Sequence, residues 1–310
     1  MIEVQSISKR YGSFLAVRDL SFSVSRGEII GLVGPNGAGK TTTMKIITGY
    51  LVPNDGRVLI DGGDVALDPV KAQERIGYLP ESNPIYPEMS VQDYLLWMGK
   101  MRGLKGSRLV ERLSYAVKAC DIEGRLTSTV RTLSKGLRQR VGIAQAILHD
   151  PDILILDEPT SGLDPNQIIE IRDLIRDLGR DKTVILSTHI LSEVEETCSR
   201  ALMIVGGTLA VDDRIDHLLG DRTLHFRVAK AGDDTAELLR AVEGVEEVRP
   251  LDAAKDTRRF LVVPKDGIDL APALFHLAVE RGWELLELSP ARRSLEDVFR
   301  EATVSGGVAS

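Results

Sequence analysis

The chain has 310 residues, 43% of them hydrophobic and 27% charged, with a formal net charge of −7. This length suits one large domain and a smaller one, and the acidic balance argues against a surface that coats nucleic acid, so we expect no nucleic-acid partner. The two cysteines, Cys120 and Cys198, are far apart and predict neither a disulfide framework nor a zinc site. No run approaches the roughly eighteen apolar residues of a membrane span, so any membrane crossing would need another subunit.

The N-terminal part predicts strands that lead into a glycine-rich loop and a helix. Apolar and polar residues alternate from Ile2 to Val24, as in partly buried strands, with a turn after Tyr11. The apolar run Ile29–Val33 predicts a buried strand, and residues 42–48 predict a helix that Gly49 ends.

The loop between that strand and helix has the spacing of a phosphate-binding loop, a glycine and four residues followed by Gly-Lys-Thr. Its backbone N–H groups and the positive end of the helix dipole would hold a polyphosphate. We expect Lys40 to reach the β- and γ-phosphates and the Thr41 hydroxyl to ligate Mg²⁺, while Tyr11 either stacks on an adenine ring or only packs. The candidate phosphate-binding residues are Gly34, Pro35, Asn36, Gly37, Ala38, Gly39, Lys40, Thr41 and Thr42.

A helical segment between about residues 82 and 150 interrupts an alternation of strands and helices. Caps and apolar spacing predict three helices in it. After it, short apolar runs of the kind that parallel sheets bury on both faces alternate with a helix. The elements predicted here are helices 90–102, 107–119 and 134–148, then strand 153–156, helix 164–179, and strands 183–188, 201–205 and 209–211.

The pattern changes near residue 220, so we divide the chain into residues 1–220, 221–303 and a flexible tail, 304–310. The second part predicts the order strand, helix, strand, strand, helix, strand, which is the ferredoxin-like order, followed by a short helix at 295–302. It contains no catalytic constellation. It is either a regulatory or contact module or a packing extension with no role of its own.

Two carboxylates follow the buried strand 153–156, and a histidine follows the strand 183–188. Because the carboxyl ends of parallel strands form the ligand crevice, Asp157 is placed to hold the metal of a bound polyphosphate. Glu158 could orient or deprotonate the attacking water. His189 could reach the γ-phosphate or that water if the two strands are neighbours.

A second anion-binding site is predicted at the start of the helix 134–148. The Ser134 hydroxyl, the Gly136 amide and the helix N-terminus together favour an anion. This site lies in the helical segment, apart from the phosphate loop. Two half-sites on one chain suggest that two chains meet face to face, each completing the nucleotide site of the other.

These motifs, in this order, resemble the ATP-binding subunit of an ABC transporter over nearly all of Ile2 to Leu219. Tyr11 corresponds to the adenine-stacking aromatic, and Leu133–Leu137 to the Leu-Ser-Gly-Gly-Gln signature. Residues 161–164 correspond to the loop that joins the two sites, and His189 to the switch histidine.

The resemblance implies an α/β P-loop NTPase of the ABC ATPase type, with a mixed sheet and a helical insert, followed by a small α+β ferredoxin-like domain. It implies ATP and Mg²⁺ as cofactors, Thr41 and Asp157 at the metal, and ATP hydrolysis by Glu158 with His189 and Glu81 as catalytic neighbours. It also implies a second ATPase subunit, an integral membrane permease subunit, and a peripheral location at the cytoplasmic face of the membrane.

The chain departs from the family pattern at three positions. Glu81 stands where a glutamine usually approaches Mg²⁺, Lys135 replaces a signature glycine, and Leu137 replaces the signature glutamine. The wider pattern resembles ATPases of two-component, often exporting systems, such as drug and gliding-associated exporters, with residues 82–106 either docking on the permease or packing within the insert. The alternative is a soluble ABC-type ATPase not linked to transport, although such proteins usually carry two cassettes in one chain.

Overall fold

The computed structural model describes residues 1–219, 223–252, 257–265, 268–291 and 294–306. The chain forms two compact units, one made of Met1–Ile215 with the residues from Phe299 onward, the other of Asp216–Val298. The division therefore falls at residue 215, earlier than the 220 that the sequence predicts, and the end of the chain belongs to the first unit.

An antiparallel sheet of four strands opens the first unit, in the order β2-β1-β4-β5. Alternate residues of its two long strands are buried, because one sheet face packs on the core. The strands are β1 (Ile2–Tyr11), β2 (Phe14–Val24), β4 (Asp55–Ile60) and β5 (Gly63–Asp64).

The central sheet has six strands in the order β10-β9-β3-β8-β7-β6. All of its pairs are parallel except the antiparallel pair of β9 and β10, so the sheet is mixed, as the resemblance implies. Every residue of β7 and β8 is buried, as expected for strands covered on both faces. The strands are β3 (Ile29–Val33), β6 (Ile76–Leu79), β7 (Ile153–Asp157), β8 (Thr183–Thr188), β9 (Arg200–Val205) and β10 (Thr208–Arg214).

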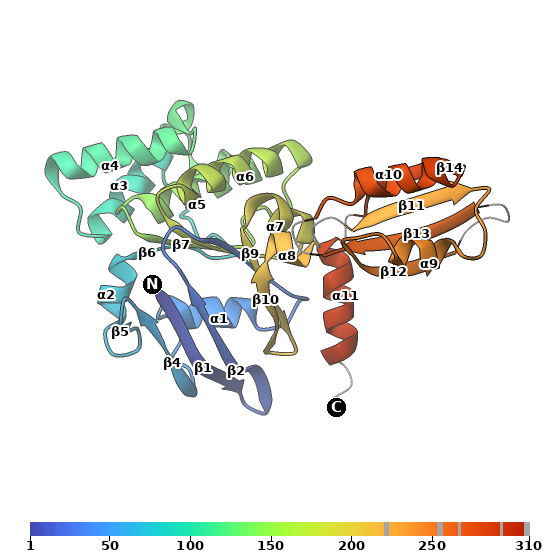
Figure 1. Ribbon diagram of the computed structural model, residues 1–310. Coiled ribbons are helices and arrows are strands. Elements are labelled where there is room, and N and C mark those ends of the chain that lie inside the picture. The colour runs from blue at the N-terminus through green and yellow to red at the C-terminus, as the bar shows by residue number, and fades with distance from the viewer. Residues whose placement is uncertain (220–222, 253–256, 266–267, 292–293, 307–310) are drawn as a thin grey trace. The chain divides into compact units, whose positions relative to one another are not determined.

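Helices cover the central sheet on both faces, with α1 between the two sheets and α5 and α6 on the opposite side, whereas α3 and α4 pack on each other and on α5 (Figure 1). Side chains of Ser90, Ser134 and Asp164 accept backbone N–H bonds at the starts of α3, α5 and α6, as their sequence positions predict. The helices are α1 (Lys40–Ile47), α2 (Pro69–Glu74), α3 (Val91–Met101), α4 (Gly106–Ala119), α5 (Lys135–Ile147), α6 (Pro165–Gly179) and α7 (Leu191–Thr197). Shorter helices lie at Glu123–Arg125 and Val130–Thr132, and α8 (Ile215–Leu218) spans the point in the chain where the first unit ends and the second begins.

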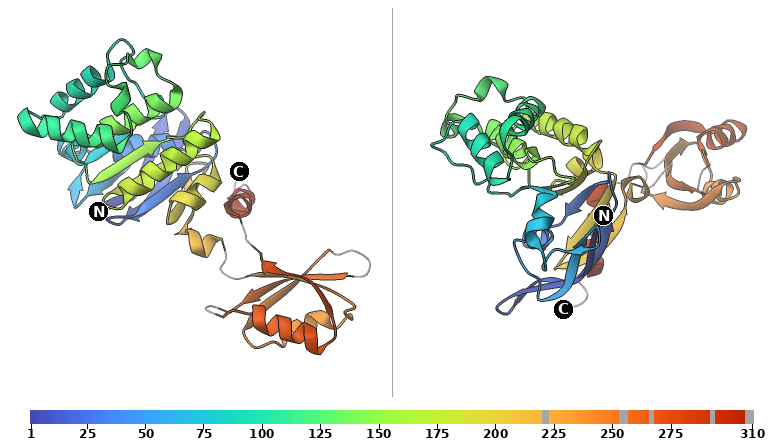
Figure 2. Two further views of the ribbon diagram at one scale, coloured as in Figure 1. Left: turned by 90° about the horizontal axis from the view of Figure 1, so that it is seen from above. Right: turned by 90° about the vertical axis from the view of Figure 1, so that its left-hand side faces the viewer.

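The second unit is a four-stranded antiparallel sheet in the order β12-β13-β11-β14, with α10 packed along it (Figure 2). Its elements follow one another in the predicted ferredoxin-like order, around a core that includes the fully buried Phe226. They are β11 (Leu224–Ala229), α9 (Thr235–Arg240), β12 (Val245–Leu251), β13 (Thr257–Pro264), α10 (Ala271–Glu280) and β14 (Glu284–Pro290).

The final helix, α11 (Leu295–Gly306), extends beyond the predicted residues 295–302 and takes in the first three residues of the predicted flexible tail. The expectation for those residues is corrected, because nothing before Gly306 breaks the helix and the Thr303 hydroxyl donates to the Phe299 carbonyl at 2.7 Å. The rest of the tail, 307–310, lies outside the described residues.

Candidate functional site

The glycines of the phosphate loop are required by both space and backbone conformation. A Cβ on Gly39 would lie 2.5 Å from the Ala16 carbonyl oxygen, and one on Gly34 would collide with the carbonyl oxygen of Ile204. Gly37 and Gly39 also have φ angles of 81° and 107°, in the left-handed region where a side chain is strained. The loop can therefore bring its backbone N–H groups close to an anion at the start of α1.

Lys40, the first residue of α1, is buried with its ammonium group folded over the loop. Its Nζ donates to the carbonyl oxygens of Gly34 at 2.8 Å and Pro35 at 3.3 Å. A bound phosphate can replace these two carbonyls as the acceptor of the Lys40 ammonium, because an ammonium bonds more strongly to an anion than to neutral oxygens.

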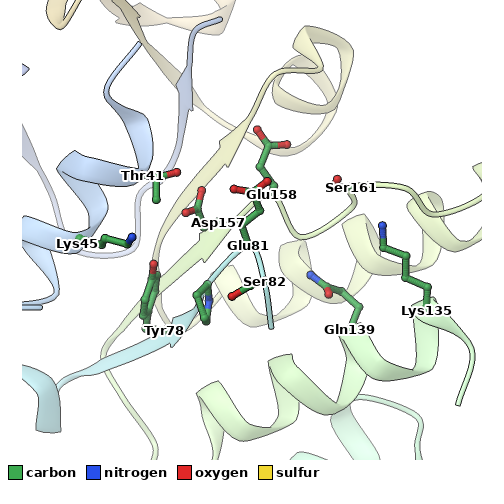
Figure 3. A pocket seen from close by; sticks show the side chains of 11 residues that line it. Thr41, Lys45, Tyr78, Glu81, Ser82, Lys135, Gln139, Asp157, Glu158 and Ser161 are labelled. Carbon is green, nitrogen blue, oxygen red and sulfur yellow. The ribbon is translucent and has the colours of Figure 1, made fainter. Parts of the chain in front are cut away.

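Two neighbouring pockets gather most of the predicted site residues. Thr41, Glu81 and Glu158 line both of them. The first is also lined by Lys45, Tyr78, Pro80, Ser82, Lys135, Gln139, Asp157 and Ser161 (Figure 3). The second is also lined by Tyr11, Phe14, Ala16, Asn36, Gly37, Ala38, Gly39, Lys40 and Thr42. Tyr11 is 48% exposed at the outer edge of the second pocket, where a flat ligand ring could lie against it.

Asp157 ends β7 and is 1% exposed. One carboxylate oxygen, Oδ1, accepts a hydrogen bond from the Ser187 hydroxyl, and the two residues are paired across β7 and β8. The other oxygen, Oδ2, is buried and has no hydrogen-bond partner within the described parts of the chain. An orphaned carboxylate oxygen beside the Thr41 hydroxyl is the oxygen donor set that Mg²⁺ prefers, so these residues fit the metal.

Glu158 follows directly and is held in an unusual backbone conformation, with φ at +50°. Its N–H donates to the Ser187 carbonyl oxygen at 3.1 Å, which fixes this strained turn against the next strand. The Glu158 side chain is 8% exposed, and its Oε2 accepts a hydrogen bond from His189 Nδ1 at 2.8 Å. Burial raises the pKa of this carboxyl, and the bond from His189 opposes the rise. A carboxylate whose pKa is raised is a stronger base and can accept a proton from water.

The two residues of the predicted second anion site lie elsewhere. The Ser134 hydroxyl caps α5 by accepting the Leu137 N–H at 3.3 Å, and Gly136 is buried against the side chain of Gln167. Neither is among the described residues that line the two pockets. The structure thus gathers Tyr11, residues 36–42, Glu81, Asp157 and Glu158 at the pockets, with His189 bonded to Glu158, whereas Gly34, Pro35, Ser134 and Gly136 line neither pocket.

Sequence reasoning missed two residues at this site. Ser187 bonds to Asp157, and Tyr78 on β6 faces the pocket with a buried hydroxyl that has no partner among the described residues. The pairing of β7 with both β6 and β8 places them there. The only sequence signal for Ser187 is its place near the end of the predicted strand 183–188. That place indicates a contact with Asp157 only once the two strands are known to be neighbours.

A phosphate loop between a buried strand and a helix, with buried aspartate and glutamate at the end of another strand, defines a P-loop nucleoside triphosphatase. A family model described as ABC transporter matches residues 17–161. The chain is 34% identical to the uncharacterized ABC transporter ATP-binding protein YhcH of Bacillus subtilis (strain 168), over 98% of this chain and 96% of the relative. It is 32% identical to the Nod factor export ATP-binding protein I of Cupriavidus metallidurans, over 98% of this chain and 97% of the relative.

Among solved structures, one titled as an ATP-binding subunit of an ABC transporter superposes with a TM-score of 0.64 and 32% identity, over 70% of this chain and 91% of that one. The chain therefore belongs to the ABC transporter family, as an ATP-binding subunit that hydrolyses ATP. Among the helices that the structure describes, none is both long and apolar enough to span a membrane.

Proposed function

We propose that this chain binds ATP·Mg²⁺ in the two pockets around the phosphate loop and drives export through a separate membrane permease subunit. The observation that carries the proposal is the pair of neighbouring carboxylates at the end of β7: Asp157, with an orphaned buried oxygen, and Glu158, bonded to His189. Export is supported by the relative named as a Nod factor export ATP-binding protein, which aligns with nearly the whole chain.

Each residue has a role in this proposal. Tyr11 stacks on the adenine, and the loop N–H groups and Lys40 bind the phosphates. Thr41 and Asp157 hold Mg²⁺, whose charge, when bound, would offset that of the β- and γ-phosphates. Glu158 takes the proton of the attacking water while His189 fixes the orientation of the carboxylate. Glu81 is assigned to approach the same water, because it lines both pockets.

The residues left outside the pockets support the proposal of a second copy. Ser134 and Gly136 stand at the anion-binding start of α5 and line neither pocket of their own chain, although Lys135 and Gln139 of the same helix line the first one. We propose that each contacts the γ-phosphate bound by a second copy, so that ATP closes the pair and hydrolysis reopens it. The pair would transmit this motion to a permease at the cytoplasmic face of the membrane.

The surface proposed for the permease is the start of the helical insert. Tyr86, Trp97 and Met101 are 51%, 37% and 67% exposed. Tyr86 contacts the Trp97 ring edge-on at 5.0 Å, so the loop before α3 is braced on that helix while it keeps an apolar surface. This loop begins directly after Glu81, so the proposed permease surface is next in sequence to a residue that lines the nucleotide pockets. A change at the nucleotide could therefore be passed to the permease.

The test is the oligomeric state of Glu158→Gln with ATP and Mg²⁺, measured by sedimentation velocity. The proposal expects a dimer with ATP and a monomer without it, because binding is retained and turnover is blocked. Glu158→Gln combined with Lys40→Ala is the matched control and should need about tenfold to hundredfold more ATP to dimerise, since it lacks the phosphate contact. A monomer for Glu158→Gln at saturating ATP would remove the paired site.

A further inference from the structure

The short helix α7 carries a buried acid, Glu193, that none of the roles above uses. Its side chain lies in the first unit and is 2% exposed. Burying a carboxylate costs several kcal/mol unless hydrogen bonds or a cation offset it. Within the described residues Glu193 has no ion-pair partner within 4.0 Å and its Oε1 is buried without a hydrogen-bond partner, so the hydrogen bonds to Oε2 are what holds the side chain there.

Those hydrogen bonds come from two different segments of the chain. Glu193 Oε2 accepts from the Thr160 hydroxyl at 2.8 Å and from the Thr188 hydroxyl at 2.8 Å. The Thr188 oxygen in turn accepts the N–H of Ile190 at 3.1 Å, which fixes the turn between β8 and α7. All three side chains are buried, with Thr160 at 2% and Thr188 at 0% exposed.

The two segments are the ones that carry the proposed catalytic pair. Thr160 comes two residues after Glu158, and Thr188 directly precedes His189. The Glu158–His189 hydrogen bond of 2.8 Å therefore runs beside a second link, from Thr160 through Glu193 to Thr188. A second link has a physical purpose here, because the left-handed φ of Glu158 is strained and His189 is half exposed.

An apolar side chain would fill the position of Glu193 without the cost of burying a charge. What the acid adds is the hydrogen-bonded link between Thr160 and Thr188. We propose that Glu193 is a positioning residue, which holds the Glu158 and His189 segments in register so that the carboxylate stays aimed at the attacking water. The inference rests on the proposed roles of Glu158 and His189. It adds a residue from outside the pockets.

The test compares three variants by steady-state ATP hydrolysis and by calorimetric ATP binding. Glu193→Leu removes the acceptor, and Thr160→Val removes one donor at nearly constant shape. Thr160→Ser keeps the hydroxyl and is the matched control. A small misplacement of a catalytic group costs about tenfold to hundredfold in rate. We expect kcat to fall by about that factor in the first two variants, with the ATP Kd and KM within about twofold, and Thr160→Ser to remain near the wild-type kcat.

Three outcomes decide the matter. Wild-type kcat in Thr160→Val would overturn the inference even if Glu193→Leu fails to fold. An equal loss of ATP affinity and kcat would do the same, because it indicates general damage to the unit. Glu158→Gln is measured alongside. If this variant turns over ATP normally, the proposed function itself fails. If its kcat falls while the kcat of Thr160→Val stays at the wild-type value, only the role of Glu193 is removed.

Discussion

The two units of this chain differ in where they keep their polar groups. In the first unit, buried charged side chains meet at the carboxyl ends of β7 and β8, where Asp157, Glu158 and Glu193 are each less than 9% exposed. In the second unit, the described buried side chains are apolar except for Thr235. Its charges form pairs near the surface instead, such as Lys230 with Glu284, which are 70% and 53% exposed.

The difference separates chemistry from packing. Burying a charge is unfavourable, and a fold retains such groups where their electrostatics are used. Apart from Lys182, which pairs with Asp150 at the other end of β8, the first unit concentrates them there and leaves Asp157 Oδ2 without a partner in the described structure. The second unit offers an apolar core and surface ion pairs, which contribute little stability when exposed. We therefore expect substitutions in the core of the second unit to change stability, and substitutions at the carboxyl ends of β7 and β8 in the first unit to change nucleotide chemistry.

The largest expected effect sharpens this contrast from the packing side. Phe226→Ala should destabilise the second unit by about 3–5 kcal/mol, because it removes a fully buried ring from its core. Denaturant unfolding checks the loss, and calorimetry should find an unchanged ATP Kd. Leu286→Ala, at a 46% exposed position, is the control and should stay within about 0.5 kcal/mol of the wild type. An ATP affinity that falls with Phe226→Ala would show that the second unit supports the site.

A smaller effect is expected from removing one charge of the phosphate loop. Lys40→Ala should weaken ATP binding by about tenfold to hundredfold, the equivalent of one lost hydrogen bond to a charged group. Lys230→Ala removes an ammonium from the exposed pair with Glu284 and should leave the ATP Kd unchanged. Isothermal titration measures both. Equal affinities in the two variants would contradict the placement of the phosphates.

The smallest expected effect is a pH dependence of the free energy of unfolding, caused by a histidine of the first unit. His149 Nε2 donates to the Ile76 carbonyl at 3.1 Å, and burial lowers the pKa of the imidazole to about 4. The unfolded chain, with an ordinary pKa near 6.5, binds the proton more readily, so stability falls as pH drops from about 6.5 toward 4. At pH 5.5 the loss is about 1.4 kcal/mol.

His149→Gln keeps a donor for Ile76 without the titration, so its free energy of unfolding should change less between pH 7 and pH 5.5 than that of the wild type. Urea unfolding at the two pH values makes the comparison. The same pH dependence in both proteins would assign the acid sensitivity to another group.

The strongly patterned elements could be predicted from the sequence, because apolar periodicity and caps are local signals. The run 153–156 and the caps Ser134 and Asp164 are examples, and the structure has β7, α5 and α6 there. The short helices α2 and α7 were not predicted, since six or seven residues carry little periodicity.

The site divides in the same way. The phosphate loop and the carboxylates after β7 are contiguous in sequence, so spacing alone indicated them. Ser187, Tyr78 and Glu193 act through neighbours that are distant in sequence, and their contacts depend on strand order and on how α7 packs. Such contacts are tertiary, and single-sequence patterns do not contain them.

The most direct test of the account is ATP binding and ATP turnover measured on the same preparation of Glu158→Gln. The glutamine keeps the shape of the side chain and loses the base. We predict an ATP Kd within about twofold of the wild type and a kcat lowered by at least about a hundredfold. Glu284→Gln, in the second unit, should leave both unchanged. Normal turnover in Glu158→Gln would contradict the claim that the carboxylate at the end of β7 performs the hydrolysis.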